Sequence, residues 1–356
     1  MSPSSLPATR VYREYPSTQD PSLRLFANFI TPPEPRPILV SMHGWHGEAK
    51  HGGHPDNVVT VADSGWFLIE PDMRGRGDST GHPDCNGWEL QDVVDAVTFA
   101  LREYAGHIAS PDSIYLTGGS GGGGNVLGLL GKFPDRFCTA VCEACISDYG
   151  RWHEHDSAGE FRDEMEGKSW VGGSPATRPE AYASRGGFTT VGNLLTPLAM
   201  THGELDSRCP VEQARRYLDL AERLGTRHRI EYFELLGVAA TGGHFGGITP
   251  EQEARRQALI QRQLAPPRQP VILPRRGRMT VAGYLKTRAF EVIFDSIDSI
   301  GTVTYDLDHG TFAISARTAT SAVLRVRQTD SAWRETRVKP GQPDQNVTPR
   351  NGNVIS

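Results

Sequence analysis

Short apolar runs alternate with amphipathic segments over the first two-thirds of the chain. Runs this short, bounded by polar and turn-forming residues, predict buried strands. They lie at Leu23–Ile30, Ile38–Met42, Gly65–Glu70, Cys138–Cys142, Leu198–Met200 and Arg229–Phe233, and a further run starts at Ile114.

Apolar residues at helical spacing lie between several of these strands. The pattern from Leu90 to Leu101 predicts an amphipathic helix, and further helices are expected at Gln213–Leu224 and Glu251–Leu264. Strands and helices that alternate in this way form a mostly parallel sheet with helices on both faces. The sequence therefore predicts an α/β fold, whose ligands are expected beyond the carboxyl ends of the strands.

The pattern changes after a proline-rich boundary at Ala265–Pro270. Beyond it, the runs have the spacing of strands: Phe290–Phe294, Thr302–Leu307, Thr311–Ser315 and Ala322–Val326. We expect a first domain over 1–265 and a small, all-β, β-sandwich-like accessory domain over 266–356, with a loose tail after Lys339. Residues 1–21 are polar and interrupted by prolines, and we expect them to form an extended arm.

One segment interrupts the alternation of strands and helices in the first domain. Residues 147–193 are polar, aromatic and rich in glycine. Such an insertion is typical of a lid over a binding site. The sequence predicts a cap that lies over the site.

A glycine cluster follows the strand that starts at Ile114. The residues Gly118-Gly119-Ser120-Gly121-Gly122 match G-x-S-x-G, and an apolar helical pattern comes next. This order is typical of a nucleophile elbow, in which a sharp turn exposes the serine hydroxyl. A simple Gly/Ser loop or a phosphate-binding turn remains an alternative, although no Lys-Ser/Thr follows the glycines as in a P-loop.

A serine hydroxyl needs a base to accept its proton and a carboxylate to orient that base. Asp206 follows a predicted strand, and His244 follows the next one within a glycine-rich loop. Glu204 and, less favoured, Asp148 are alternative acids. We expect His202 to bond backbone near the site rather than to act as the base.

Several motifs in order resemble the α/β-hydrolase superfamily. They are Asp72-x-Arg74-Gly75-x-Gly77-x-Ser79, Gly119-Ser120-Gly121-Gly122, His202-Gly203-x-x-Asp206 and Gly243-His244. Within that superfamily, residues 20–264 are most similar to the catalytic domain of the prolyl oligopeptidase group, with its dienelactone-hydrolase and cocaine-esterase relatives. The resemblance implies Ser120 as nucleophile, Asp206 as acid and His244 as base, with no cofactor. Gly121 departs from the tyrosine that many peptidase relatives carry there.

An oxyanion hole requires two hydrogen-bond donors where negative charge develops. The backbone N–H of Gly121 is one candidate. The loop after Ile38–Met42 supplies the other, for which we favour Trp45 over Gly44. Trp45 and Trp152 are candidates for the substrate pocket, and simple core packing is the alternative for both.

Charge and composition exclude several other functions. From Pro266 onward there are 13 basic and 8 acidic residues, so residues 1–265 carry a net charge of −10 within a total of −5. This acidity argues against nucleic-acid binding. For the basic accessory domain, a polysaccharide or a protein remains a candidate partner.

Membrane and metal functions also find little support in the sequence. The chain lacks an apolar run long enough for a membrane span, and its start lacks a signal peptide, so we expect a soluble or cytoplasmic protein. Five cysteines, an odd number, are expected to be reduced thiols. The spacing of His43, His46, His51 and His54 matches no compact zinc pattern, and no metal is expected.

The sequence therefore predicts a serine hydrolase that cleaves a carboxylic ester, or an amide, through an acyl-enzyme. Esters are favoured because their leaving groups need less assistance and no propeller pattern precedes the site. A prolyl oligopeptidase-like serine peptidase is the first alternative. A non-catalytic binding or assembly protein on the same scaffold is the second.

Overall fold

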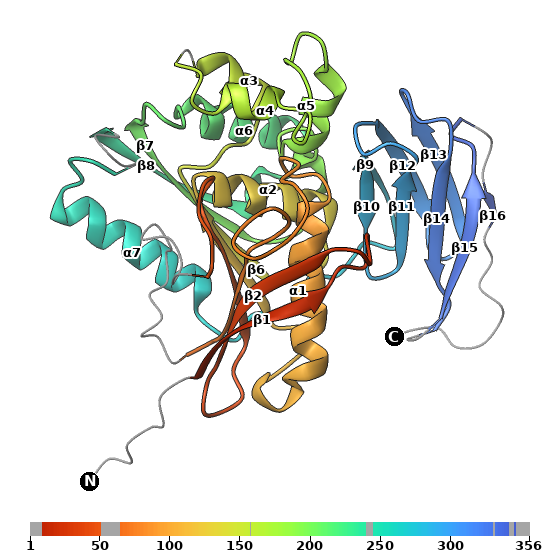
Figure 1. Cartoon of the computed structure of the whole chain (residues 1–356), viewed down its shortest axis with the longest axis horizontal. Helices are drawn as coiled ribbons and strands as arrows, with labels where there is room; N and C mark the ends of the chain where they lie inside the picture. The colour runs from red at the N-terminus through yellow and green to blue at the C-terminus, as the bar shows by residue number, and fades with distance from the viewer. Residues whose placement is uncertain are drawn as a thin grey trace.

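The computed structural model describes residues 9–50, 65–156, 158–239, 245–329, 332–341 and 345–346. Its strands form two sheets of eight, one in the α/β part and one in the C-terminal part. In Figure 1 the C-terminal strands lie next to the α/β part, on the side that carries α1 (Glu89–Glu103) and α2 (Gly121–Lys132).

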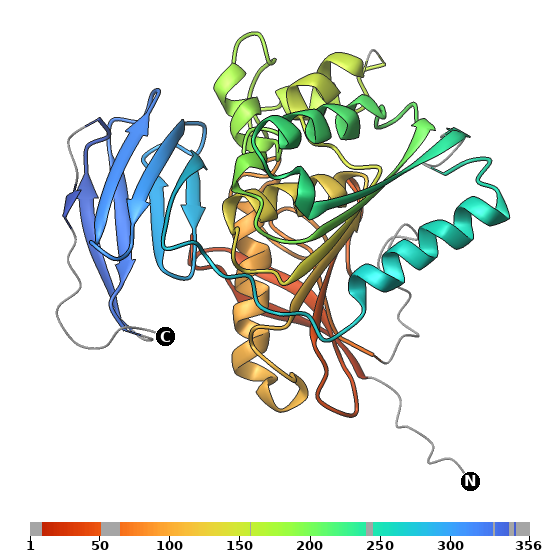
Figure 2. The same cartoon turned by 180° about the vertical axis from the view of Figure 1, so that it is seen from behind.

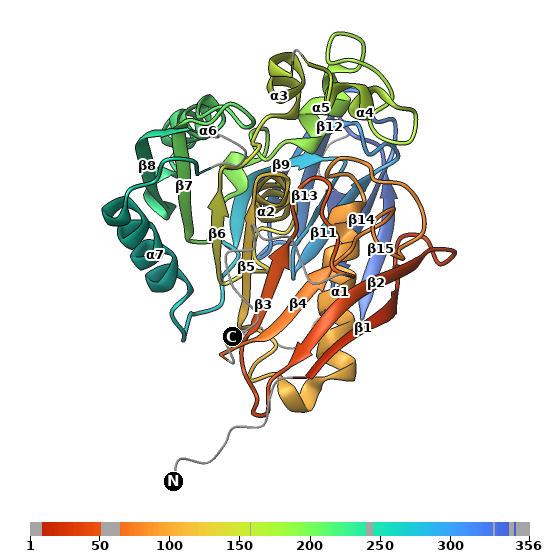
Figure 3. The same cartoon turned by 60° about the vertical axis from the view of Figure 1, so that its left-hand side comes forward.

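The first sheet has the strand order β1-β2-β4-β3-β5-β6-β7-β8. Strands β1 and β2 are antiparallel additions, whereas the neighbours from β4 to β8 are all parallel. This arrangement confirms the predicted α/β-hydrolase fold (Figure 3). The strands are β1 (Thr9–Pro16), β2 (Arg24–Thr31), β3 (Ile38–Met42), β4 (Phe67–Pro71), β5 (Ile114–Gly119), β6 (Thr139–Glu143), β7 (Leu198–Leu205) and β8 (Ile230–Ala239).

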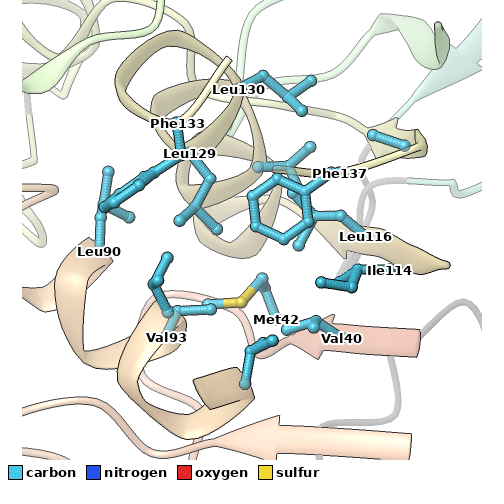
Figure 4. Close-up of a cluster of buried hydrophobic side chains, with 14 of the residues drawn as sticks. Val40, Met42, Leu90, Val93, Ile114, Leu116, Leu129, Leu130, Phe133 and Phe137 are labelled. Atoms are coloured by element: carbon cyan, nitrogen blue, oxygen red, sulfur yellow. The ribbon is translucent and has the colours of Figure 1, made fainter. Parts of the chain in front are cut away.

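Helices cover both faces of this sheet because alternate residues of each strand point to opposite sides. Val40 and Met42 enter the larger core, which contains residues of α1 (Glu89–Glu103), α2 (Gly121–Lys132) and α6 (Glu212–Arg223) (Figure 4). Leu39 enters the opposite core, which contains residues of α7 (Pro250–Leu264). Figure 2 shows α7 on its own face of the sheet.

The predicted cap is a helical segment between β6 and β7. It contains α3 (Tyr149–His155), α4 (Arg162–Glu166), α5 (Pro179–Arg185) and the short η2 (Val191–Asn193). Its aromatic side chains form a separate small core that also includes Cys85 and Cys209. Two other short helices, η1 (Ala105–His107) and η3 (Arg227–Arg229), lie in connections of the α/β part.

The second sheet is entirely antiparallel, with the order β15-β14-β11-β10-β9-β12-β13-β16. One face of it encloses a core of its own that includes Val281, Leu285 and Phe290. The strands are β9 (Arg276–Ala282), β10 (Tyr284–Lys286), β11 (Phe290–Phe294), β12 (Ile300–Asp306), β13 (Thr311–Ala316), β14 (Ala322–Arg327), β15 (Trp333–Val338) and β16 (Gln345–Asn346). The all-β character is confirmed, while independent folding of two domains stays a prediction.

Several elements differ from the sequence prediction. Thr9–Pro16, expected within an extended arm, pairs with β2 as a full strand. β8 continues to Ala239, six residues beyond the predicted end, where its outer face is exposed. The sequence pattern does not predict β9, β10, β15 or β16, and β16 pairs with β13 within the tail that was expected to be loose after Lys339. Because β15 is largely exposed and charged, its sequence lacks the apolar alternation that marks a strand.

Candidate active site

Ser120 lies in the sharp turn between β5 and α2. Its φ of 57° and ψ of −122° cost a non-glycine residue of order 1–3 kcal/mol, and such strain concentrates at functional sites. The turn is tight, because a Cβ added at Gly118 would lie 2.5 Å from the carbonyl oxygen of Gly122. The Ser120 N–H donates to the Glu143 carbonyl over 2.9 Å. This is the strand–turn–helix geometry expected of a nucleophile elbow.

Asp206 lies in the turn directly after β7, and this turn contacts the elbow. Its Oδ1 accepts the backbone N–H groups of Arg208 (2.9 Å) and Cys209 (2.8 Å), and only 5% of the residue is exposed. The Cys209 Sγ lies 4.0 Å from the Ser120 Oγ. The fold therefore brings the turn of the predicted acid to the predicted nucleophile, although 86 positions separate the two residues in sequence.

The alternative acid and base residues are engaged elsewhere. His202 Nε2 lies 2.6 Å from the carbonyl oxygen of Cys209, which can only accept, so this nitrogen carries the proton and cannot take another. Glu204 accepts the N–H of Gly237 over 2.8 Å. Asp148 caps α3 by accepting the N–H of Arg151 over 3.1 Å.

His244, the predicted base, lies outside the described residues. Its neighbour in sequence, Phe245, is described and is half-buried beneath α7. The Arg256 guanidinium lies 4.7 Å from the centre of the Phe245 ring. The position of His244 relative to Ser120 therefore stays a prediction.

The two predicted oxyanion donors come from segments that touch. A Cβ added at Gly121 would lie 2.6 Å from the backbone nitrogen of Trp45 and 2.8 Å from its Cα. Gly121 is the first residue of α2, and the first N–H groups of a helix have no partner within it. This close approach favours the prediction that the backbone N–H groups of Gly121 and Trp45 donate to the same oxyanion.

The cap holds the Trp45 indole in place. Its Nε1–H donates to Glu164 over 2.6 Å, and its ring stacks on Trp170 with 4.9 Å between centroids. Trp152 packs edge-on against the same indole at 4.9 Å. Trp152 itself is 2% exposed and donates Nε1–H to the Arg208 carbonyl over 2.8 Å. Trp152 thus packs in the cap core, whereas Trp45 faces the cavity described next.

A narrow cavity adjoins Gly121 and Trp45. Its volume of about 20 Å³ is roughly the space for one water molecule. Arg76 lines it, with the guanidinium 5.1 Å from the centre of the Trp170 ring. The cavity is also lined by buried titratable residues, among them Glu89, whose pKa burial raises, and His43, whose pKa burial lowers.

No described residues form a metal site. Among them, no group of three or more His, Cys, Asp or Glu side chains is arranged to hold a metal ion. His43 and His46 are described and point to other partners, the Gly44 carbonyl (2.8 Å) and Glu164 (2.9 Å). His51 and His54 lie outside the described residues. None of the described helices is long and apolar enough to cross a membrane.

Sequence reasoning missed several residues around the elbow. Cys209 could have been found from its place three positions after Asp206 in the same turn. Arg76 occupies a variable position of the motif at residues 72–79, and Glu143 and Arg256 lie outside every motif. Only the folded arrangement brings them together.

Comparison with protein families decides the classification of this chain. The model of the prolyl oligopeptidase family (Peptidase_S9) matches residues 54–262, which is more than half of the chain. This chain belongs to the prolyl oligopeptidase family. The match contains Ser120, Asp206 and His244, while β3 and the second sheet lie outside it. The predicted family resemblance is confirmed.

Two relatives of this family member come from Bacillus subtilis strain 168. The uncharacterized peptidase YuxL is 26% identical over 205 residues, which cover 55% of this chain and 30% of YuxL. The uncharacterized peptidase YtmA is 27% identical over 177 residues, which cover 49% of this chain and 64% of YtmA. The chain thus spans less than two-thirds of the length of either relative.

Two solved structures share the fold at low sequence identity. The acylaminoacyl peptidase of Pyrococcus horikoshii has a TM-score of 0.58 and 21% identity, covering 72% of this chain and 41% of its own. A puromycin-hydrolyzing peptidase of Mycobacterium tuberculosis has a TM-score of 0.59 and 18% identity, covering 74% and 40%. At these identities the likeness establishes the fold.

Proposed function

We propose that this chain is a serine hydrolase that cleaves ester and amide bonds through an acyl-enzyme. Ser120 is the nucleophile, His244 the base and Asp206 the acid. The observation that carries the proposal is the strained Ser120 placed 4.0 Å from the thiol of the Asp206 turn. Membership of the prolyl oligopeptidase family supports the same class of reaction.

The proposed reaction follows from the roles of these groups. His244 takes the Ser120 hydroxyl proton as Oγ attacks the substrate carbonyl carbon, and the oxyanion accepts the Gly121 and Trp45 N–H groups. The imidazolium then gives the proton to the leaving alcohol or amine. A water molecule repeats the sequence on the acyl-enzyme and releases the acid, while Asp206 stabilises the imidazolium in both steps.

Peptide amides and esters are both proposed substrates. The relatives named as peptidases favour amides. Esters undergo the same acyl transfer with a better leaving group, so the predicted esterase activity and the alternative peptidase activity belong to one site. The narrow cavity beside Gly121 and Trp45 favours a small group on the acyl side.

Steady-state kinetics of p-nitrophenyl acetate and of peptide p-nitroanilides test the proposal. Ser120→Ala should lower kcat at least about 10⁴-fold, as loss of a triad nucleophile does. Asp206→Asn should also lower kcat strongly, whereas the matched variant Glu204→Gln, two residues away, should stay within about threefold of wild type. Turnover retained by folded Ser120→Ala would reject the nucleophile and with it the proposed function.

A further inference from the structure

Arg256 on α7 forms a buried ion-pair network. A capping box fixes the start of the helix, because Thr249 Oγ1 accepts the N–H of Gln252 over 3.2 Å. The Arg256 guanidinium contacts Glu143 through Nε and, over 2.9 Å, through Nη2. Its Nη1 donates to Glu253 over 2.9 Å. The Arg256 side chain is 13% exposed and that of Glu143 only 2%.

Glu143 connects this arginine to two segments of the proposed site. Its backbone carbonyl accepts the N–H of Ser120 over 2.9 Å. Its carboxylate accepts the Thr201 hydroxyl over 2.8 Å, and Thr201 lies on β7, the strand that leads to Asp206. Glu143 thus contacts both the elbow and the strand of the predicted acid.

The same guanidinium also reaches the loop after β8. It lies 4.7 Å from the centre of the Phe245 ring, within the range of a cation–π contact. Phe245 is covalently joined to His244, the predicted base. Arg256 therefore contacts both Phe245, the residue next to the predicted base, and Glu143. Glu143 in turn contacts the elbow and the strand that leads to Asp206.

The free energy of unfolding alone does not explain why Arg256 and Glu143 form a buried ion pair. Burying two charges costs desolvation energy, and well-packed apolar residues often serve as well or better. A buried network does fix the relative positions of the segments it joins. Catalysis requires such fixed positions, because small displacements of catalytic groups lower the rate steeply.

We propose that Arg256 is a positioning residue for the hydrolase reaction. Paired with Glu143 and lying over the Phe245 ring, it holds the segment that starts at Phe245 against the strand ends that carry Ser120 and Asp206. This inference rests on the proposed function, because it assigns His244 as the group that is positioned.

The matched control is Arg255, the preceding residue on the same helix. Arg255 stacks on Phe233 of β8 with 4.2 Å to the ring centre. Arg255→Met removes an equivalent cation–π contact of α7 without touching Glu143 or Phe245. Arg256→Met, Arg256→Lys and Arg255→Met are compared for thermal midpoint, and for kcat and KM with p-nitrophenyl acetate.

Arg256→Met should lower kcat about 10- to 100-fold and change KM less than threefold. Arg256→Lys, which keeps the charge opposite Glu143 but loses the planar stack, should be intermediate. Arg255→Met should stay within twofold of wild type.

Equal losses in Arg256→Met and Arg255→Met, or unchanged kcat in Arg256→Met, would overturn the inference. If Arg256→Met does not fold, Phe245→Leu keeps the ion pair and removes the stacked ring. A kcat unchanged in that variant would also contradict the inference. Failure of the proposed function is separate, since it requires turnover by Ser120→Ala.

Discussion

At the scale of single residues, the candidate site depends on how closely backbone segments approach one another. Ser120 has a strained, positive-φ conformation at the sharp turn between β5 and α2. Gly121 lies so close to Trp45 that a side chain cannot fit between them. Gly118, Gly121 and Gly122 are therefore required by space, because an added Cβ at each would lie within 3 Å of backbone atoms.

Gly121→Ala tests this close approach. The added Cβ would meet the Trp45 backbone at 2.6 Å, so one of the two proposed oxyanion donors must move. We expect kcat to fall about 100-fold or more, equivalent to roughly 3 kcal/mol of transition-state stabilisation. Circular dichroism and ester kinetics check the variant; a folded protein with wild-type kcat would show that these two amides do not form the oxyanion hole.

At the scale of elements, the apolar pattern predicts β3 to β6 and does not reveal β1, β9, β10 and β15. β3 to β6 are completely buried, and their apolar runs mark them in the sequence. β1 and β15 expose most of their residues, so hydrogen bonding to a neighbouring strand, rather than burial, defines them. Periodicity cannot reveal such pairing.

The residues of the candidate site also differ in whether the sequence reveals them. Ser120 and Asp206 follow buried strands within ordered motifs, and the structure brings the turn of Asp206 to the elbow. Arg256 and Glu143 are 113 positions apart, and neither lies in a motif. Their contact depends on how α7 packs against β6, which local sequence does not specify.

Two tryptophans of the cap test how burial determines the contribution of a side chain to stability. Trp152 is 2% exposed and stacks on Phe161 with 4.6 Å between centroids. Trp152→Ala should lower the free energy of unfolding by about 3–5 kcal/mol, as for other buried aromatic residues. The half-buried Trp170→Ala should cost less. Urea denaturation measures both, and equal losses would contradict the different burial of the two side chains.

At the scale of the whole molecule, the helix that follows the nucleophile also contacts the second sheet. Lys132, at the end of α2, is 1% exposed; its Nζ donates to the Ala282 carbonyl and lies 4.5 Å from the centre of the Tyr284 ring. Tyr284 stacks on Trp88 at 4.6 Å. The two sheets are thus joined through a buried cation and paired aromatic rings.

This cation should make stability depend on pH. Burial lowers the pKa of Lys132 from 10.5 to about 7. Between these values the unfolded state binds more protons, so the free energy of unfolding rises with pH; below about pH 7 both states are charged and the contribution is constant. From pH 7 to 9, wild type should gain about 2–3 kcal/mol relative to Lys132→Met. Urea denaturation at each pH measures the difference, and a constant difference would contradict the lowered pKa.

The central claim is that Ser120 is an activated nucleophile, and covalent labelling tests it most directly. The purified chain is treated with a fluorophosphonate, and intact mass and peptide mapping locate the adduct. We predict one adduct per chain on Ser120, none in Ser120→Ala, and strongly slowed labelling in His244→Ala. A folded wild-type chain that takes up no label, or takes it up at another residue, would contradict the account.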